Sequence, residues 1–180
     1  MRLVHEVRSV FVCLKVMKRI KLTKRLQALA DLVEKGASVA DIGTDHGYLP
    51  VYLAQTHAYG KIFASDVSAA SLAAAHRSAA DYDVLEAITF ITAPGLVGII
   101  PKDTDTIVIA GLGGETIINI LENAQWTKNH NVTLILQPQS KIDLLSRFLY
   151  DNGYEIKQTK SIIDKRKHYT VFLVTGEKLS

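Results

Sequence analysis

The chain carries at residues 40–50 the sequence ADIGTDHGYLP, directly after a short apolar run that is typical of the end of a buried strand. Asp41 stands where this predicted strand stops. Gly43 and Gly47 allow a tight turn and a close approach of the backbone to a ligand, because neither carries a Cβ atom. The apolar positions from Tyr48 onward predict a helix that tolerates a proline in its first turn. An acidic residue and two glycines between a strand and a helix indicate a nucleoside-binding crevice.

The spacing of the two glycines distinguishes between kinds of nucleoside site. A dinucleotide site would show Gly-x-Gly-x-x-Gly and a P-loop would show Gly-Lys-Ser/Thr, whereas this loop reads Gly-x-x-x-Gly. Asp41 and Asp45 would also place two negative charges beside a diphosphate. S-adenosylmethionine (SAM) carries a sulfonium and an amino group and no phosphate, so carboxylates favour it. The loop therefore favours SAM, with an ordinary strand-to-helix turn as the alternative.

A second acidic residue follows the next predicted strand. Residues 61–65 read as that strand, and Asp66 comes at its end, about twenty residues beyond the glycine turn, where an acidic side chain can take a ribose. An ionised carboxylate accepts two hydrogen bonds at once and so suits the two ribose hydroxyls. Asp66 would also serve as a helix N-cap, as would Ser68. The loop upstream makes ribose binding the favoured interpretation.

The rest of the chain alternates short apolar runs with helical patterns. Nearly continuous apolar strands are typical of a parallel sheet that is covered on both faces. Thr23 is a suitable N-cap for the first helix, and Gly36 is a suitable end for it. The further strands are predicted at 88–92, 106–110 and 132–136, and the further helices at 48–55, 69–80, 114–121 and 141–152.

The end of the chain breaks this alternation. Two strand-like runs, 154–163 and 169–174, are separated only by residues 164–168, which is too short for a crossover helix. The pair is therefore predicted to form an antiparallel hairpin. A mostly parallel, seven-stranded α/β sheet that ends in an antiparallel hairpin is the Rossmann-like fold of class I SAM-dependent methyltransferases.

The composition limits the class of protein to which the chain can belong. The chain has 180 residues, of which 48% are hydrophobic and 22% charged, and this suits one globular domain. A net charge of +3 permits a polyanionic partner without requiring one. The single cysteine, Cys13, excludes an internal disulfide and fits a reducing compartment, so we expect a cytoplasmic protein. We expect neither a membrane span nor a metal site, and the oligomeric state stays open.

Residues 1–16 stand apart from the rest. Charged residues interrupt their apolar background and no small-residue cleavage site follows, so they do not read as a signal peptide. We interpret 1–16 as an N-terminal extension of doubtful status and 17–180 as the folded domain.

Four stretches carry a more specific resemblance. They are LTKRL at 22–26, VADIGTDHGYLP at 39–50, IAGLGG at 109–114 and LILQP at 134–138. Together they resemble the bacterial TrmK family, class I enzymes that methylate N1 of an adenine in the D-arm of tRNA. The resemblance extends over about residues 22–176 and implies a tRNA (adenine(22)-N(1))-methyltransferase. SAM is the implied cofactor and tRNA the implied partner.

The chemistry of methyl transfer and the resemblance together suggest roles for individual residues. Asp45 would stabilise the positive charge that develops on the adenine ring and take the proton later lost from the exocyclic amine, and Gln137 would hydrogen-bond the edge of the base. Asp66 would hold the ribose of SAM. The residues expected to bind the cofactor are Asp41, Gly43, Thr44, Gly47, Asp66, Val67, Gly111 and Gly113.

Two departures from the family pattern support an alternative. After the third strand the family usually carries Gly-Asp-Gly-Leu, whereas this chain has Ala-Pro-Gly-Leu at 93–96, which removes a side-chain acceptor for the adenine of SAM. The family's C-terminal helical domain is expected to be absent, because the sequence stops at Ser180. The alternative is a truncated or degenerate relative that binds SAM or RNA without turnover.

Overall fold

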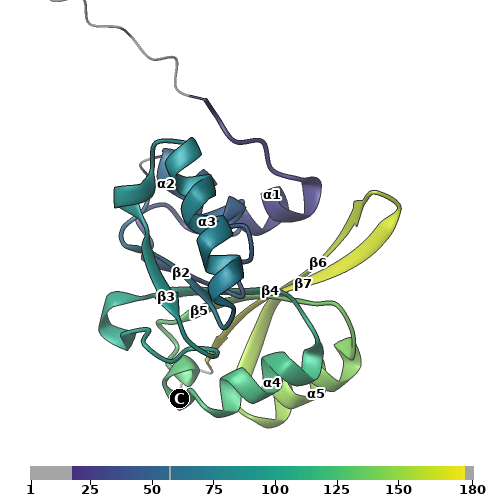
Figure 1. The fold of residues 1–180 in the computed structure, drawn as a ribbon. Coiled ribbons are helices and arrows are strands. Elements are labelled where there is room, and N and C mark those ends of the chain that lie inside the picture. Colours follow the sequence, from purple (N-terminus) through teal and green to yellow (C-terminus); the bar gives the residue numbers. More distant parts are fainter. Residues whose placement is uncertain (1–17, 57, 177–180) are drawn as a thin grey trace, which may run out of the picture.

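The computed structural model describes residues 18–56 and 58–176, and the proposed extension at 1–16 lies outside them. The described residues form a seven-stranded sheet with helices on both faces (Figure 1). The strand order is β3-β2-β1-β4-β5-β7-β6, and only the pairs of β7 with β5 and with β6 are antiparallel. This confirms the predicted fold class. Within the described ranges, every helix is too short or too polar to cross a membrane.

The parallel strands are β1 (Val39–Ile42), β2 (Ile62–Asp66), β3 (Thr89–Thr92), β4 (Thr106–Leu112) and β5 (Thr133–Pro138), and the hairpin consists of β6 (Tyr154–Asp164) and β7 (Lys167–Gly176). The helices are α1 (Lys24–Ala30), α2 (Tyr48–Thr56), α3 (Ala69–Asp81), α4 (Gly114–Glu122) and α5 (Ile142–Asp151), with short 3-10 turns at Leu85–Ala87, Pro101–Asp103 and Gln125–Lys128.

Two apolar layers hold the helices to the sheet. Helices α1, α2 and α3 cover one face, and α4 and α5 cover the other (Figure 1). Alternate residues of one strand serve the two layers: Val108 belongs to the first, and Ile107 and Ile109 belong to the second. All three are fully buried, and burial of such a side chain stabilises a fold by about 1.5–3 kcal/mol. Burial on both faces explains why the strands read as continuous apolar runs.

Thr23 caps α1 as predicted, because its hydroxyl accepts a hydrogen bond from the backbone N–H of Leu26. The helix ends earlier than predicted, at Ala30, and Gly36 lies in the turn that follows, with φ of 88°. Strand β4 also runs further than predicted. It continues through Gly111, whose φ is 80°, and its register against β5 shifts at that point.

The hairpin turn is tighter than the sequence predicts. The expected five-residue connection is a two-residue turn of Lys165 and Arg166, since Asp164 and Lys167 are already paired. Both turn residues have positive φ, 46° and 66°, as in the type I′ turns that match the twist of a hairpin. The hairpin extends past the sheet on the side of α1 (Figure 1). Near its other end, a bulge between Ile156 and Gln158 shifts the register of β6 against β7.

Candidate functional site

A cavity of about 790 Å³ opens at the carboxyl edge of the parallel strands. It lies where β1 and β4 are neighbours and the strand order reverses, which is where open α/β sheets bind their ligands. Helix α1 and the tip of the hairpin also contribute to its wall. The site residues expected from the sequence that line it are Asp41, Gly43, Thr44, Asp45, Asp66, Val67 and Gly111.

Asp41 is a buried carboxylate at the base of this cavity. Its Oδ2 atom accepts a hydrogen bond of 2.7 Å from the hydroxyl of Thr44. Burial raises the pKa of Asp41 to about 6, although the Thr44 hydrogen bond and the charge of Arg25 both lower it. Among the described residues no cationic side chain forms an ion pair with Asp41. A cationic ligand would therefore compensate a charge that the protein itself leaves incompletely paired.

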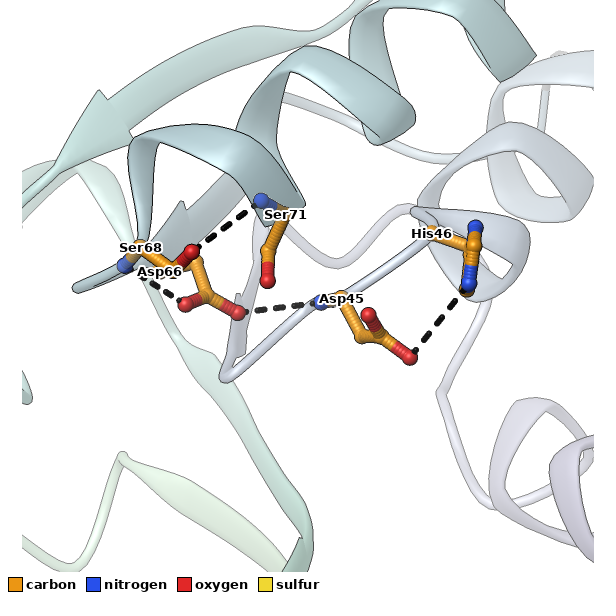
Figure 2. A network of polar contacts seen from close by, with 5 residues as sticks. All are labelled: Asp45, His46, Asp66, Ser68 and Ser71. Atoms are coloured by element: carbon orange, nitrogen blue, oxygen red, sulfur yellow. Dashed lines mark hydrogen bonds and ion pairs between the residues drawn. The ribbon is translucent and has the colours of Figure 1, made fainter.

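Asp66 is held between the backbones of two loops (Figure 2). Its Oδ2 atom accepts from the N–H of Asp45 at 3.1 Å, and its Oδ1 atom accepts from the N–H of Ser68 at 2.9 Å. The cap of α3 is Ser68, whose hydroxyl accepts from the N–H of Ser71. Because each carboxylate oxygen can accept more than one hydrogen bond, Asp66 is oriented before a ligand binds and keeps capacity for hydroxyl donors.

Asp45 and His46 form the outer rim of the site (Figure 2). Asp45 has φ of 51°, and 71% of its side chain is exposed. Its Oδ2 atom lies 3.9 Å from Nε2 of His46, and the ring of His46 stacks on that of Tyr48 at 5.4 Å. The backbone of Asp45 is thus fixed by Asp66, while its carboxylate stays available to a substrate.

The four glycines expected at the site divide into two pairs. Gly43 and Gly111 line the cavity, with φ of 73° and 80°. Gly47 and Gly113 lie outside its lining. A Cβ atom on Gly47 would stand 2.8 Å from that of Ala75, so this glycine allows the start of α2 to pack against α3. Gly113 is the N-cap residue of α4.

Gln137 is placed differently from what the sequence suggested. Its side chain is fully buried beneath the cavity and does not line it. Its Oε1 atom accepts from Nη1 of Arg25 at 2.9 Å, and its Nε2 atom donates to the carbonyl of Pro138 at 2.8 Å. Both ends of the amide are therefore used within the protein. In this arrangement the amide of Gln137 holds Nη1 of Arg25, which itself lines the cavity.

Sequence reasoning gave no role to Gln139 and Asp164, which line the opposite wall of the cavity together with Arg25 and Tyr169. The backbone N–H of Arg25 donates to Oδ2 of Asp164 at 3.1 Å, and this hydrogen bond is the main reason that the pKa of Asp164 is lowered. The guanidinium carbon of Arg25 lies 5.7 Å from the centre of the Tyr169 ring. The available signal was Arg25 in LTKRL, one of the stretches that carries the resemblance.

Comparisons with known proteins agree with this geometry. A family model described as a methyltransferase domain matches residues 22–172. The crystal structure of the Bacillus subtilis m1A22 tRNA methyltransferase TrmK superposes with a TM-score of 0.82 at 31% identity, covering 88% of this chain and 68% of that one. The chain belongs to the TrmK family of methyltransferases. The family resemblance expected from the sequence is thereby confirmed.

A sequence comparison and one further solved structure agree with this. The curated tRNA (adenine(22)-N(1))-methyltransferase of Bacillus subtilis is 32% identical over 157 residues, which cover 87% of this chain and 66% of the relative. The chain thus spans slightly less than two thirds of that protein. A structure of Streptococcus pneumoniae Sp1610, a putative tRNA (m1A22) methyltransferase, in complex with S-adenosyl-L-methionine has a TM-score of 0.81 at 30% identity, covering 89% and 75% of the two chains.

Proposed function

We propose that this chain transfers a methyl group from SAM to N1 of an adenine in the D-arm of tRNA. The observation that carries the proposal is the pair of carboxylates, Asp41 and Asp66, at the ends of neighbouring strands in one cavity at the reversal point of the sheet. The names of the Bacillus subtilis and Streptococcus pneumoniae relatives support the reaction and the donor. The reaction would take place in the bacterial cytoplasm, where tRNA is found.

The donor fits the residues that are present. Asp41 would face the cationic methionine end, because its buried charge lacks an ion-pair partner among the described side chains. Asp66 would accept from the ribose hydroxyls with the oxygen capacity that its two backbone contacts leave. Val67, whose residue surface is 69% exposed, offers an apolar contact beside the ribose position.

Methyl transfer depends more on the alignment of adenine N1 with the methyl carbon than on proton transfer. Bound SAM supplies an electrophilic methyl group: a bond from adenine N1 to the methyl carbon forms while the sulfur–carbon bond breaks and its electron pair returns to sulfur. Positive charge then resides on the adenine ring. The exposed carboxylate of Asp45 would stabilise that charge, and the buried amide of Gln137 would position Arg25 in the acceptor side of the cavity.

Two measurements on the full chain test the proposal in sequence. Titration calorimetry with SAM should show binding, and incubation with unmodified tRNA should place methyl groups at N1 of a D-arm adenine. Binding without transfer would favour the alternative of a relative that has lost turnover. Failure to bind SAM would overturn the proposal.

The role of Asp45 has its own test. Asp45→Asn removes the negative charge but keeps the size of the side chain, so kcat at saturating substrates should fall by about tenfold or more if the charge stabilises the transition state. The affinity for SAM should change little. Near-normal turnover would remove Asp45 from this role.

A further inference from the structure

Gln139 is a cavity residue that the proposed reaction has not yet used. It follows β5 directly, and its backbone N–H donates to the carbonyl of Leu112 at 2.8 Å, which fixes the base of the side chain. The residue is exposed and lines the cavity. Among the described residues, no protein group forms a hydrogen bond with its side-chain amide. Gln137, two positions earlier, has both ends of its amide bonded inside the protein.

The amide of Gln139 lies over the end of β4. An ideal Cβ atom on Gly111 would be 3.4 Å from Nε2 of Gln139 and 3.8 Å from Nη1 of Arg25. Both polar heads therefore lie close to Gly111, where the three residues line the same part of the cavity. Of the two polar heads, that of Arg25 is already bonded to Gln137, whereas that of Gln139 is available.

We propose that Gln139 recognises the adenine to be methylated through its N6 and N7 atoms and thereby leaves N1 free to react. The proposal rests on the proposed function and deepens it. A glutamine amide presents one donor and one acceptor, which match the N7 acceptor and the N6 amine of adenine in a bidentate pair. Contact at that edge leaves the N1 lone pair unoccupied.

The same geometry disfavours guanine. Guanine presents two acceptors, N7 and O6, at the corresponding edge, so the oxygen of the amide would face another oxygen. Tyr169, which also lines the cavity, provides an aromatic face on which an unstacked base can rest.

The test compares two tRNA substrates and three forms of the full chain. One tRNA carries adenine at the methylated position, and the other carries 7-deazaadenine there, which lacks N7 but keeps N1 and the exocyclic amine. The proteins are the unaltered chain, Gln139→Ala and the control Gln158→Ala, which changes an exposed glutamine of β6 outside the cavity.

We expect Gln139→Ala to lower kcat/KM for the adenine substrate by about tenfold, within the range of one bidentate base contact. The unaltered chain and Gln158→Ala should lose a similar factor on 7-deazaadenine. Gln139→Ala should show no further loss on that substrate, because the contact to N7 is already gone. Any intrinsic change in the reactivity of N1 affects all three proteins equally and cancels in the comparison.

Three results would overturn the proposal. The first is an unchanged 7-deazaadenine penalty in Gln139→Ala, which would assign the contact to another group. The second is an equal loss of SAM affinity in Gln139→Ala, which would assign this residue to the donor. The third is absence of transfer to any adenine by the unaltered chain, which would overturn the proposed function together with this inference.

Discussion

The proposed function divides the cavity into a donor half, formed by Asp41, Thr44, Asp66 and Val67, and an acceptor half, formed by Arg25, Gln139 and Tyr169. The donor half comes from two neighbouring strands and their loops, within residues 41–67. The acceptor half joins α1, the end of β5 and the hairpin. Arg25 is 112 positions from Gln137 and 139 positions from Asp164 in the sequence, and it forms a hydrogen bond with each. The donor half is thus a local motif, whereas the acceptor half exists only once the hairpin has docked on α1.

This difference leads to separate expectations. Substitutions in the donor half should change the affinity for SAM, and substitutions in the acceptor half should change the kinetics with RNA. A substitution that moves both quantities equally would argue against two independent halves.

The largest expected effect is in the donor half. Asp66→Asn exchanges a carboxylate that already accepts two backbone N–H groups for an amide with one acceptor oxygen. The amide carries no charge and leaves too few acceptor sites for the two ribose hydroxyls, so SAM binding should weaken by about 100-fold in calorimetry. Asp151→Asn, at an exposed position at the end of α5, is the matched control and should bind normally. A loss below threefold in Asp66→Asn would contradict ribose binding by Asp66.

Ionisation of Asp41 should destabilise the ligand-free protein at neutral pH. Its pKa of about 6 in the folded chain exceeds the ordinary value of 3.8, so the folded state binds the proton more tightly than the unfolded state does. The penalty is present above pH 6 and disappears as the pH falls toward 4. Asp41→Asn should therefore be more stable than the unaltered chain by about 2 kcal/mol at pH 7. Urea unfolding at a series of pH values would measure this, and a gap that is as large at pH 4 as at pH 7 would refute it.

The same carboxylate should make SAM binding depend on pH. Only ionised Asp41 compensates a cationic ligand, so SAM affinity should fall about tenfold between pH 8 and pH 5 as the group is protonated near pH 6. Asp41→Asn should bind weakly and show no such dependence. An unaltered chain whose affinity is flat across this range would place the cationic end of the donor elsewhere.

A smaller effect is expected in the acceptor half. Arg25→Lys keeps the positive charge but loses the planar guanidinium that bonds Gln137 and faces Tyr169. We expect kcat/KM for tRNA to fall about fivefold while SAM affinity stays within twofold, since one hydrogen bond is worth about 1 kcal/mol. Arg147→Lys, on the exposed side of α5, is the control. An equal loss in SAM affinity would contradict the division of the cavity into two independent halves.

The smallest effect concerns the hairpin turn. The double variant Lys165→Asn and Arg166→Gly removes two charges but suits the positive φ of both positions, because Asn-Gly is the preferred type I′ pair. RNA binding should weaken by about threefold and depend less steeply on salt, while SAM binding stays unchanged. An unchanged salt dependence would show that the turn makes no phosphate contact.

Much of the fold could be predicted because its signals are local. Apolar runs marked the strands, Thr23 marked the start of α1, and the short interval after residue 163 marked the hairpin. The ends of elements were less predictable. Nothing in the sequence pattern shows that Asp31 closes α1 before Gly36, or that β4 continues through Gly111.

The candidate site likewise has features that the sequence predicts and features that it does not. Asp41 and Asp66 follow predictable strand ends, so their common place at the sheet edge could be anticipated, while their roles toward SAM stay predictions. The contact of Arg25 with Asp164 could not be anticipated, because it depends on how far the hairpin extends over α1. The burial of Gln137 and the exposure of Gln139 could not be predicted either, because they depend on β5 ending at Pro138, which leaves the first glutamine inside the sheet and the second beyond it.

The bulge in β6 bears on how the molecule behaves in a crowded solution. β6 is an outermost strand of 11 residues, long enough for a strand of another molecule to extend the sheet, whereas β3 at the opposite border has only 4. The irregular register between Ile156 and Gln158 interrupts that surface, and the exposed Lys157 stands at the interruption. Such features are known to hinder edge-to-edge aggregation. The hairpin can therefore reach far from the core for its role at the cavity without becoming a template for open-ended assembly.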